Sequence, residues 1–463
     1  MTNPSISEEP IDMMDTLPDS LFFHILTLLP TKSAVVICML SPRRRRNLCH
    51  QLDFLDFTNF DFLYCPRLRN PHFDDETVFH HMGLQLKTLD TRFVDFINGV
   101  FSLRTMQCVR KFRISCTYDL DTTFYLYSLE SWILAIVGPH LQELQLFLPS
   151  ATYNVFYLPI SVFSCTSLVS LSLFGTIILQ KPSSPVHLPL LKTLEVDVFN
   201  AQPAESISTI LLGCPILESL YLGLHSYFID VPLIMVPSSV KRYTLVDRTF
   251  FDIDDLVIAT PSLQYLNITI TSSCLQFSVS SLDNVVEAHL DIYSEGGHVS
   301  LVFDLLRALR KTKFLDLRCS TIECLLLVPD LDFPEFSYLI HVELVLPNLN
   351  FSFVLDILQK CPMLQVITIE KDKKPESSFL ERWTPPTTVP NCLVSHLTMI
   401  IFRGYQGSPK EVAFTAYILL RGLVLKTLTV HTHFSLSLEE KHWIFEQLSN
   451  MPKASNKFQL VFT

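Results

Sequence analysis

A six-residue pattern, apolar-x-x-apolar-x-apolar, recurs along most of the chain. It reads LQELQL from Leu141, LVSLSL from Leu168 and LKTLEV from Leu191, and further copies follow as far as LQVITI from Leu364. Successive copies begin 22 to 27 residues apart, and an earlier copy begins at Val109. The last two apolar positions are two residues apart, so they lie on the same side of an extended strand. Each copy therefore predicts a short strand with one buried face.

The stretches between the copies, such as ESISTILLGCP and FVLDILQKCP, can each form one short helix. Pro215, Pro261 and Pro362 each lie two residues before a strand pattern, where proline ends a helix and turns the chain. Cys214 and Cys361 precede two of these prolines, and a small buried thiol fits such a turn. One strand and one helix cannot bury both faces alone, so the copies must stack. The pattern predicts an α/β fold, an irregular leucine-rich-repeat solenoid with parallel strands inside and helices outside.

The C-terminal part continues this pattern in a modified form. LTMIIF from Leu397 and LKTLTV from Leu425 predict two more strands, and KEVAFTAYILL between them predicts a helix. RGYQGSPKE supplies a turn in which Gly404 and Gly407 are free to take positive φ. A helix within EEKHWIFEQLSNMPKASNKFQLVF and a final FQLVF strand end the chain. We expect this different-looking last repeat to shield the end of the stack from water.

The segment from Met13 to Phe57 has a helical periodicity instead. Leu17, Leu21, Ile25 and Leu28 recur at three or four residues, which places them on one helical face. Pro18 suits the first turn of this helix, and Pro30 ends it.

Two more helices are predicted to follow in this segment. Thr31 can cap KSAVVICML, which is apolar all round and must be buried on most sides, and Ser41-Pro42 can open a third helix. Three short helices bury too little apolar surface to be stable alone. Phe22, Phe23 and Leu26 lie off the main face of the first helix, so we expect the segment to complete its core against a partner.

The stretch LPDSLFFHILTLLPTKSAVVICMLS, from Leu17 to Ser41, resembles the F-box of plant cullin-RING ubiquitin ligase receptors without a gap. In that family the Leu-Pro start and the leucines of the first helix dock on a Skp-type adaptor. The resemblance therefore implies an adaptor-binding set of Leu17, Pro18, Leu21, Ile25, Leu28, Leu29 and Pro30.

The similarity ends at PRRRRNLC, where the family has a tryptophan within KRWR. Arg44 or Arg45 takes that position, and Cys49 stands where a second tryptophan is usual. Loss of a buried tryptophan costs about 3–5 kcal/mol, which is enough to weaken a small domain. The arginine run is also consistent with a solvated helix face or with a patch for nuclear import or an acidic partner.

VPNCLVSHLTMIIFRGYQGSPKEVAFTAYILLRGLVLKTLTV resembles the FBD region at the end of plant F-box/LRR proteins. Together the resemblances cover nearly the whole chain, which is similar to the plant F-box/FBD/LRR-repeat proteins. The predicted divisions are 1–12 (mobile), 13–58 (F-box), 59–105 (transition, with a helix from Phe93), 106–370 (repeats), 371–390 (loop) and 391–463 (FBD region and cap).

Composition and charge exclude several classes of protein. The net charge of -11 argues against a general nucleic-acid binder, which needs a basic face. No run of 18 apolar residues is present, so no membrane span is expected. The 12 cysteines are scattered in apolar surroundings, which indicates reduced, buried thiols in a cytoplasmic or nuclear protein.

Motifs for catalysis are absent from the sequence. The chain has only 11 glycines and contains no GxGxxG, GxxxxGK, HExxH, CxxC or GxSxG motif. Cys319 and Cys324 are predicted to be buried thiols, and the histidine pairs His80/His81 and His431/His433 to be turn or surface residues rather than metal ligands. We therefore expect a chain without an enzymatic activity or a cofactor of its own.

The resemblance implies a substrate receptor of an SCF-type ubiquitin ligase, in which the F-box docks on the adaptor and the repeats and FBD region hold a protein substrate. Two alternatives remain open. One is a protein-binding scaffold that has lost coupling to the ligase, and the other is a small-molecule co-receptor with a pocket on the concave sheet.

Side chains alternate along a strand, so the residues between the apolar positions should face the inner side of the curve. These are Glu143, Gln145, Ser170, Ser172, Thr193, Glu195, Ser219, Tyr221, Tyr265, Asn267, Asp316, Glu343, Gln365 and Thr368. The set is polar and mildly acidic, which suits a substrate surface of basic character. Glu143, Glu195, Tyr221 and Tyr265 are the candidate substrate-binding residues.

Overall fold

The computed structural model describes residues 17–40, 52–59, 91–102, 109–116, 123–148, 155–180, 182, 184–199, 203–225, 234–248, 253–258, 260–271, 275–279, 282–293, 299–327, 333–372 and 383–463. The chain divides into two compact units, the first comprising residues 1–200 and 212–216 and the second residues 201–211 and 217–463. This division falls inside the predicted repeat region and does not test the predicted domain boundaries.

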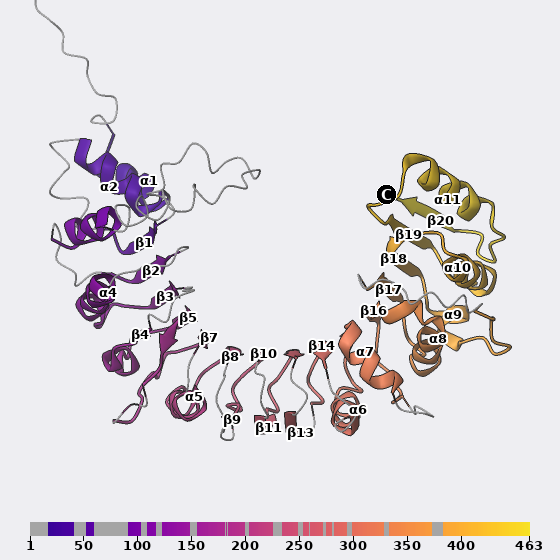
Figure 1. The fold of residues 1–463 in the computed structure, drawn as a ribbon, viewed down its shortest axis with the longest axis horizontal. Helices are drawn as coiled ribbons and strands as arrows, with labels where there is room; N and C mark the ends of the chain where they lie inside the picture. The colour runs from indigo at the N-terminus through magenta and orange to yellow at the C-terminus, as the bar shows by residue number, and fades with distance from the viewer. Residues whose placement is uncertain are drawn as a thin grey trace, which may run out of the picture. The chain divides into compact units, whose positions relative to one another are not determined.

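The first unit begins with two helices and continues into a parallel sheet (Figure 1). Helices α1 (Asp19–Thr27) and α2 (Thr31–Leu40) precede strand β1 (Phe54–Thr58). The strand order is β1-β2-β3-β5-β7, and every neighbouring pair is parallel. The other strands are β2 (Lys111–Ser115), β3 (Glu143–Leu148), β5 (Ser170–Gly175) and β7 (Thr193–Phe199), with a minor pair β4 (Phe156–Tyr157) and β6 (Ile177–Ile178).

Helices of the first unit cover the buried side of these strands. Residues 91–102 are helical, as predicted from Phe93, and α4 (Thr123–Ile136) follows, with the short 3-10 helix η6 at Ile160–Ser164. Leu144, Leu171 and Leu194 are in register on adjacent strands and are buried. Apolar residues at this one strand position therefore stack into a continuous core from repeat to repeat.

The second unit repeats the arrangement in the order β8-β10-β12-β14-β15-β16-β17-β18-β19-β20. These strands are β8 (Ser219–His225), β10 (Arg242–Asp247), β12 (Tyr265–Ile270), β14 (Glu287–Ile292), β15 (Phe314–Leu317), β16 (His341–Leu346), β17 (Val366–Lys371), β18 (Met399–Tyr405), β19 (Thr427–Thr432) and β20 (Gln459–Phe462). All of the neighbouring pairs are parallel. Every strand predicted from the six-residue pattern is present in the two units, so the predicted solenoid of parallel strands is confirmed.

The helices of the second unit are α5 (Pro203–Leu212), α6 (Val299–Ala308), α7 (Cys319–Leu326), α8 (Phe351–Lys360), α9 (Asn391–Ser395), α10 (Pro409–Arg421) and α11 (Leu438–Asn450), with the 3-10 helix η7 at Pro347–Leu349. In three consecutive repeats the prediction of a helix between the strands is wrong. A second parallel ladder, β9 (Ile234–Met235), β11 (Ile253–Ile258) and β13 (Leu275–Val279), takes its place. Pro261 thus follows a strand, whereas Pro215 and Pro362 follow helices as predicted.

The C-terminal repeats pack around aromatic side chains. Phe351 of α8 stacks on Phe414 of α10 with ring centroids 4.3 Å apart, and Trp383 lies against both rings. Trp383 belongs to the stretch 371–390 that was predicted to be a polar surface loop. Its described part therefore contributes an anchor to the aromatic cluster.

Gly404 and Gly407 have φ of 76° and 75°, so the predicted positive-φ turn is confirmed. Ser408 and Glu411 form a capping box at the start of α10, and Ser437 and Glu440 form another at α11. Cys214 and Cys361 are fully buried, as predicted, and burial raises the pKa of the Cys214 thiol to about 12. Cys324 is buried too, but Cys319 is half-buried and contacts the carboxylate of Asp372, so its predicted burial is only partial.

Candidate protein-binding surfaces

Helix α1 carries an apolar stripe that no described residue covers. Leu21, Ile25 and Leu28 are 47%, 37% and 73% exposed, whereas Phe22 and Leu26 are buried. The four-residue spacing marked Leu21, Ile25 and Leu28 as the main apolar face, and the F-box resemblance assigned them to adaptor docking. The expectation that Phe22 and Leu26 pack against a partner is wrong, because the segment's own core buries them. The helix has two apolar faces, and its own core takes the one with Phe22 and Leu26.

That core is small and is formed within the N-terminal segment. Phe22 and Leu26 pack with Ala34, Cys38 and Leu52, and the partly buried Leu17, Phe23, Leu29 and Ile37 lie around them. Helix α2, which was expected to be buried on most sides, keeps Val36 46% exposed. The predicted third helix from Ser41 lies outside the described residues.

The remaining residues of the predicted adaptor set take structural positions around the stripe. Pro18 is exposed and precedes α1, and its carbonyl accepts hydrogen bonds from the N–H groups of Leu21 and Phe22. Pro30 is exposed after the helix. Thr31 is the first residue of α2 rather than its cap, and its hydroxyl accepts a hydrogen bond from the Asp56 N–H of β1. The structure thus brings the predicted set together around one short helix.

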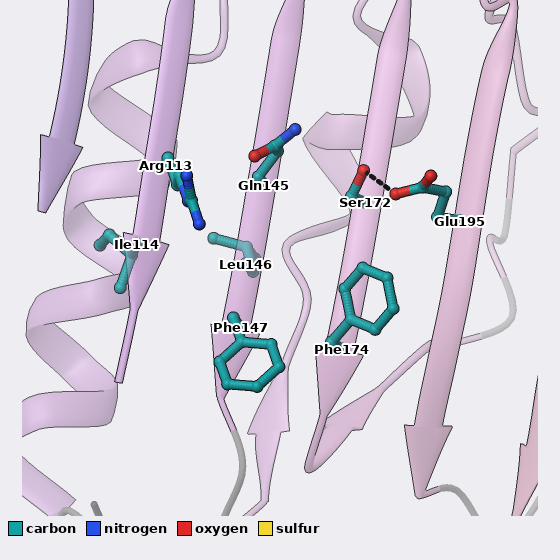
Figure 2. Close-up of a pocket in the computed structure, with 8 residues that line it drawn as sticks. All are labelled: Arg113, Ile114, Gln145, Leu146, Phe147, Ser172, Phe174 and Glu195. Carbon is teal, nitrogen blue, oxygen red and sulfur yellow. Dashed lines mark hydrogen bonds between the residues drawn. The ribbon is translucent and has the colours of Figure 1, made fainter. Parts of the chain in front are cut away.

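A second surface is the open face of the sheet, opposite the buried apolar row. In the first unit Arg113, Gln145, Ser172 and Glu195 occupy the same register position on β2, β3, β5 and β7. Figure 2 shows their side chains in one row, with the rings of Phe147 and Phe174 further along β3 and β5.

Charges on this face are partly compensated. Lys111 and Glu143 form an ion pair at 2.8 Å on neighbouring strands. The Ser172 hydroxyl donates a 2.7 Å hydrogen bond to the Glu195 carboxylate. The surface is therefore polar and mixed in charge, because Lys111 and Arg113 accompany the carboxylates of the set that was predicted to be polar and mildly acidic.

In the second unit the open face carries a strip of rings and charges. The Arg242 guanidinium lies 4.1 Å from the centroid of the Tyr265 ring, in the geometry of a cation–π contact. The Tyr265, His289, Phe314 and His341 rings follow one another across β12 to β16, with centroid distances of 5.4, 5.3 and 4.8 Å.

The pKa values of the two histidines of this strip are shifted in opposite directions. Partial burial lowers the pKa of His289, but hydrogen bonds to Asp316 (3.1 Å) and Glu287 (2.8 Å), and the charges of both, raise it further, so that the pKa lies above 6.5. Partial burial lowers the pKa of His341 below 6.5; Glu343 and Asp316 oppose that shift and Arg403 adds to it. Asp316 is fully buried and also accepts hydrogen bonds from Arg318.

The four candidate substrate-binding residues all lie on the open face, two in each unit. Glu143 and Glu195 belong to β3 and β7, and Tyr221 and Tyr265 to β8 and β12. Whether they bind a substrate remains a prediction. Of the wider predicted set, Gln365 is wrong, because it precedes β17, and the open-face position is Val366, in register with His341.

Several residues of these surfaces were missed by the sequence reasoning. They are Arg113, Phe147, Phe174, Arg242 and His289. Arg113 lies in the earlier copy from Val109, whose intervening residues were not considered. Phe147 and Phe174 lie one residue beyond the six-residue pattern, because the strands continue past it. Counting to the seventh position of each copy would have found them.

No group of three or more His, Cys, Asp or Glu that could hold a metal ion exists among the residues of the described ranges. His431 and His433 instead contact the hydroxyls of Thr463 and Ser435, and His80 and His81 lie outside the described residues. None of the helices in the described part of the chain is both long and apolar enough to span a membrane.

Comparisons with known proteins agree with this arrangement. The FBD family model matches residues 385–430, and a model described as the LRR repeats of FBD-associated F-box protein At5g56370 matches residues 129–281. F-box/FBD/LRR-repeat protein At4g26340 of Arabidopsis thaliana is 26% identical over 462 residues, covering 98% of this chain and 100% of the relative. Putative FBD-associated F-box protein At5g56820 of the same plant is 28% identical over 478 residues, covering 100% of this chain and 98% of the relative.

Proposed function

Because the chain is related along nearly its whole length to the plant F-box/FBD/LRR-repeat proteins, we propose that it is the substrate-recognition subunit of an SCF-type ubiquitin ligase. Helix α1 docks on a Skp-type adaptor, and the open face of the sheet holds a protein substrate. The other subunits of the ligase carry out the chemistry in the cytoplasm or nucleus. This chain contributes proximity and orientation, and no catalytic group.

The exposed stripe of Leu21, Ile25 and Leu28 is the observation that carries the proposal. Contiguous exposed apolar surface on a small helical unit favours association with a partner. The N-terminal helical segment already has its own core around Phe22 and Leu26, so the exposed stripe is not needed for its folding. An amphipathic helix with apolar residues at these spacings fits an apolar groove on a partner.

Co-purification with a Skp-type adaptor tests the proposal. We expect the wild-type chain to recover the adaptor and the variant Leu21→Asp plus Ile25→Asp to recover at least tenfold less, because two charges would be buried in the contact. Ser20→Asp plus His24→Asp is the matched control, since both residues are exposed on the same helix at the same spacing. Equal adaptor recovery by the stripe variant and this control would refute adaptor docking through α1.

A protein-binding scaffold without ligase coupling is the second candidate function. The observation in its favour is that the first tryptophan of the chain is Trp132, so the F-box segment has none. Variants with Trp at Arg44 or Arg45 distinguish the two candidates. The receptor function predicts adaptor binding by the wild-type chain, whereas the scaffold function predicts binding only after a tryptophan is restored.

A further inference from the structure

A small pocket lies on the open face of the first unit, between the polar row and the two phenylalanine rings (Figure 2). Its volume is about 130 Å³, and its walls come from strands β2, β3, β5 and β7. Such a volume accommodates one side chain rather than a whole ligand. The pocket is therefore suited to anchoring a residue of a bound peptide.

One side of the pocket is apolar, because the rings of Phe147 and Phe174 lie two residues further along β3 and β5 than Gln145 and Ser172. Phe147 is 43% exposed, and its ring centroid lies 6.2 Å from that of Phe174 on the next strand. Aromatic side chains, phenylalanine included, are enriched in protein interfaces, where they can form part of a pocket for a residue of the partner. Leu146 and Ile114 also line the pocket, but their side chains are fully buried on the other face of the strands. The apolar surface is therefore that of the two rings, which match an aliphatic or aromatic side chain.

The two ends of the pocket carry opposite charges. Arg113 on β2 lines one end, and Glu195 on β7 lines the other. These strands are three ladder spacings apart, which amounts to about 14 Å. A ligand that spans the pocket thus meets a guanidinium at one end and a carboxylate at the other.

Both charges can exchange their present contacts for contacts to a ligand. The Arg113 Nε lies 3.9 Å from the Asp56 carboxylate, and both side chains are substantially exposed. Ion pairs of this kind contribute little stability because water solvates them well. The Ser172 hydroxyl bonds one oxygen of Glu195, and a carboxylate has capacity for further donors.

We propose that this pocket recognises an extended peptide segment of the substrate that crosses the strands and places one acidic, one apolar and one basic side chain on the sheet. The acidic residue pairs with Arg113, and the basic residue with Glu195. The apolar residue fills the space between the rings of Phe147 and Phe174. The proposal rests on the proposed function, because it names the substrate class of the same receptor.

The spacing follows from the geometry of an extended chain. Alternate residues face the same side, and each residue advances about 3.3 Å. Residues i, i+2 and i+4 then lie on one side and span about 13 Å, close to the distance between the two charged strands. The side chain of residue i+2 extends about 6.6 Å along β3 and β5 to the rings, which requires a long apolar or aromatic side chain. The matching segment reads acidic-x-apolar-x-basic in one chain direction, or the reverse in the other.

A phage-displayed library of random short peptides, selected on the purified full chain bound to its adaptor or alone, tests this specificity. We expect the wild type to enrich an acidic and a basic residue four positions apart around a central apolar residue. Arg113→Glu should enrich basic residues at both ends, and Glu195→Lys acidic residues at both ends. Peptides selected on the wild type should bind each charge variant about tenfold more weakly, because charge reversal replaces an attraction by a repulsion between like charges. Phe147→Ala should lose the central apolar preference.

The matched control reverses an exposed ion pair elsewhere. Asp304→Lys plus Arg307→Glu on α6 should leave the selected peptides unchanged. The proposal is wrong if the wild type enriches no such spacing, or if the charge variants, verified as folded by circular dichroism, select the same peptides as the wild type. Adaptor recovery is measured separately on every variant. If the variant Leu21→Asp plus Ile25→Asp loses adaptor recovery but selects the same peptides as the wild type, the result concerns the ligase function and not this pocket.

Discussion

The hydroxyl of Thr31 accepts a 2.7 Å hydrogen bond from the backbone N–H of Asp56, and this bond joins helix α2 to the first strand of the sheet. Thr31 is almost completely buried. The helical segment is thus attached to the repeats by a polar contact in addition to apolar packing. The attachment influences how firmly a partner bound to α1 is held relative to the sheet.

Replacing Thr31 by valine should weaken this attachment. Valine has the same shape but no acceptor, so the Asp56 N–H loses its bond at a cost of about 1 kcal/mol. Hydrogen exchange of residues 54–58 should become faster, and α2 should unfold at a lower temperature. Thr31→Ser keeps the hydroxyl and is the control. Unchanged exchange in Thr31→Val would show that the bond does not stabilise the junction.

His289 should make the second unit more stable in acid than in alkali over its titration range. Its pKa is raised in the folded chain, so its contribution is fully present below the unfolded value of about 6.5 and is lost as pH rises through the higher folded pKa. His289→Gln should remove this decline from the unfolding free energy measured across pH 6 to 8, a range set by histidine titration.

His341 provides the matched control, because its folded pKa is lowered. Its contribution is present above the unfolded pKa and is lost as pH falls through the folded value. The wild type should therefore lose stability as pH falls below about 6.5, and His341→Gln should abolish this loss without changing the stability at higher pH. If the free energy of unfolding depends on pH in the same way in His289→Gln and His341→Gln, the opposite pKa shifts of the two histidines are contradicted.

Gly407→Ala should destabilise the C-terminal cap more than Gly404→Ala. Both residues have positive φ, which costs a residue with a side chain about 1–2 kcal/mol. A Cβ at Gly407 would in addition lie 2.9 Å from the Cγ1 of Ile444, whereas a Cβ at Gly404 meets its nearest atom at 4.0 Å. Thermal unfolding of the two variants, with hydrogen exchange over α11, measures the difference. Equal losses of stability in the two variants would mean that α11 moves away from the added Cβ at Gly407 without an energetic cost.

Ser408→Ala should lower the stability of the same region by about 1 kcal/mol, as expected for loss of a helix cap. Ser408 caps α10 through a reciprocal pair of hydrogen bonds with Glu411, which is 2% exposed. Ser437→Ala removes a similar box at α11, where both partners are exposed and water can replace them. We expect a smaller loss there, and urea unfolding of both variants tests the order.

The strand pattern could be predicted from sequence because each strand buries apolar residues at alternate positions, whatever its neighbours do. The helices between strands were harder. In the repeats of β9, β11 and β13 the connecting segments pair with one another, and this ladder exists only when the repeats are stacked. No single repeat carries that information.

The surfaces depend on register, which explains what was missed. Phe147 and Phe174 are 27 residues apart in sequence and become neighbours only through the pairing of β3 with β5. For α1 the periodicity indicated two apolar faces but not which of them is buried. Packing against α2 and Leu52 decides in favour of Phe22 and Leu26.

The parallel ladders have a consequence for how such a surface can change over time. Each strand bonds its neighbours in the same register, so row positions are preserved whatever the length of the chain between strands. After duplication or loss of one whole repeat, the strands that become neighbours would pair in the same register, and the rows of side chains across the sheet would stay aligned. The separation of two recognition residues such as Arg113 and Glu195 can thus grow or shrink in steps of about 4.8 Å, while the chemistry at each end is inherited unaltered.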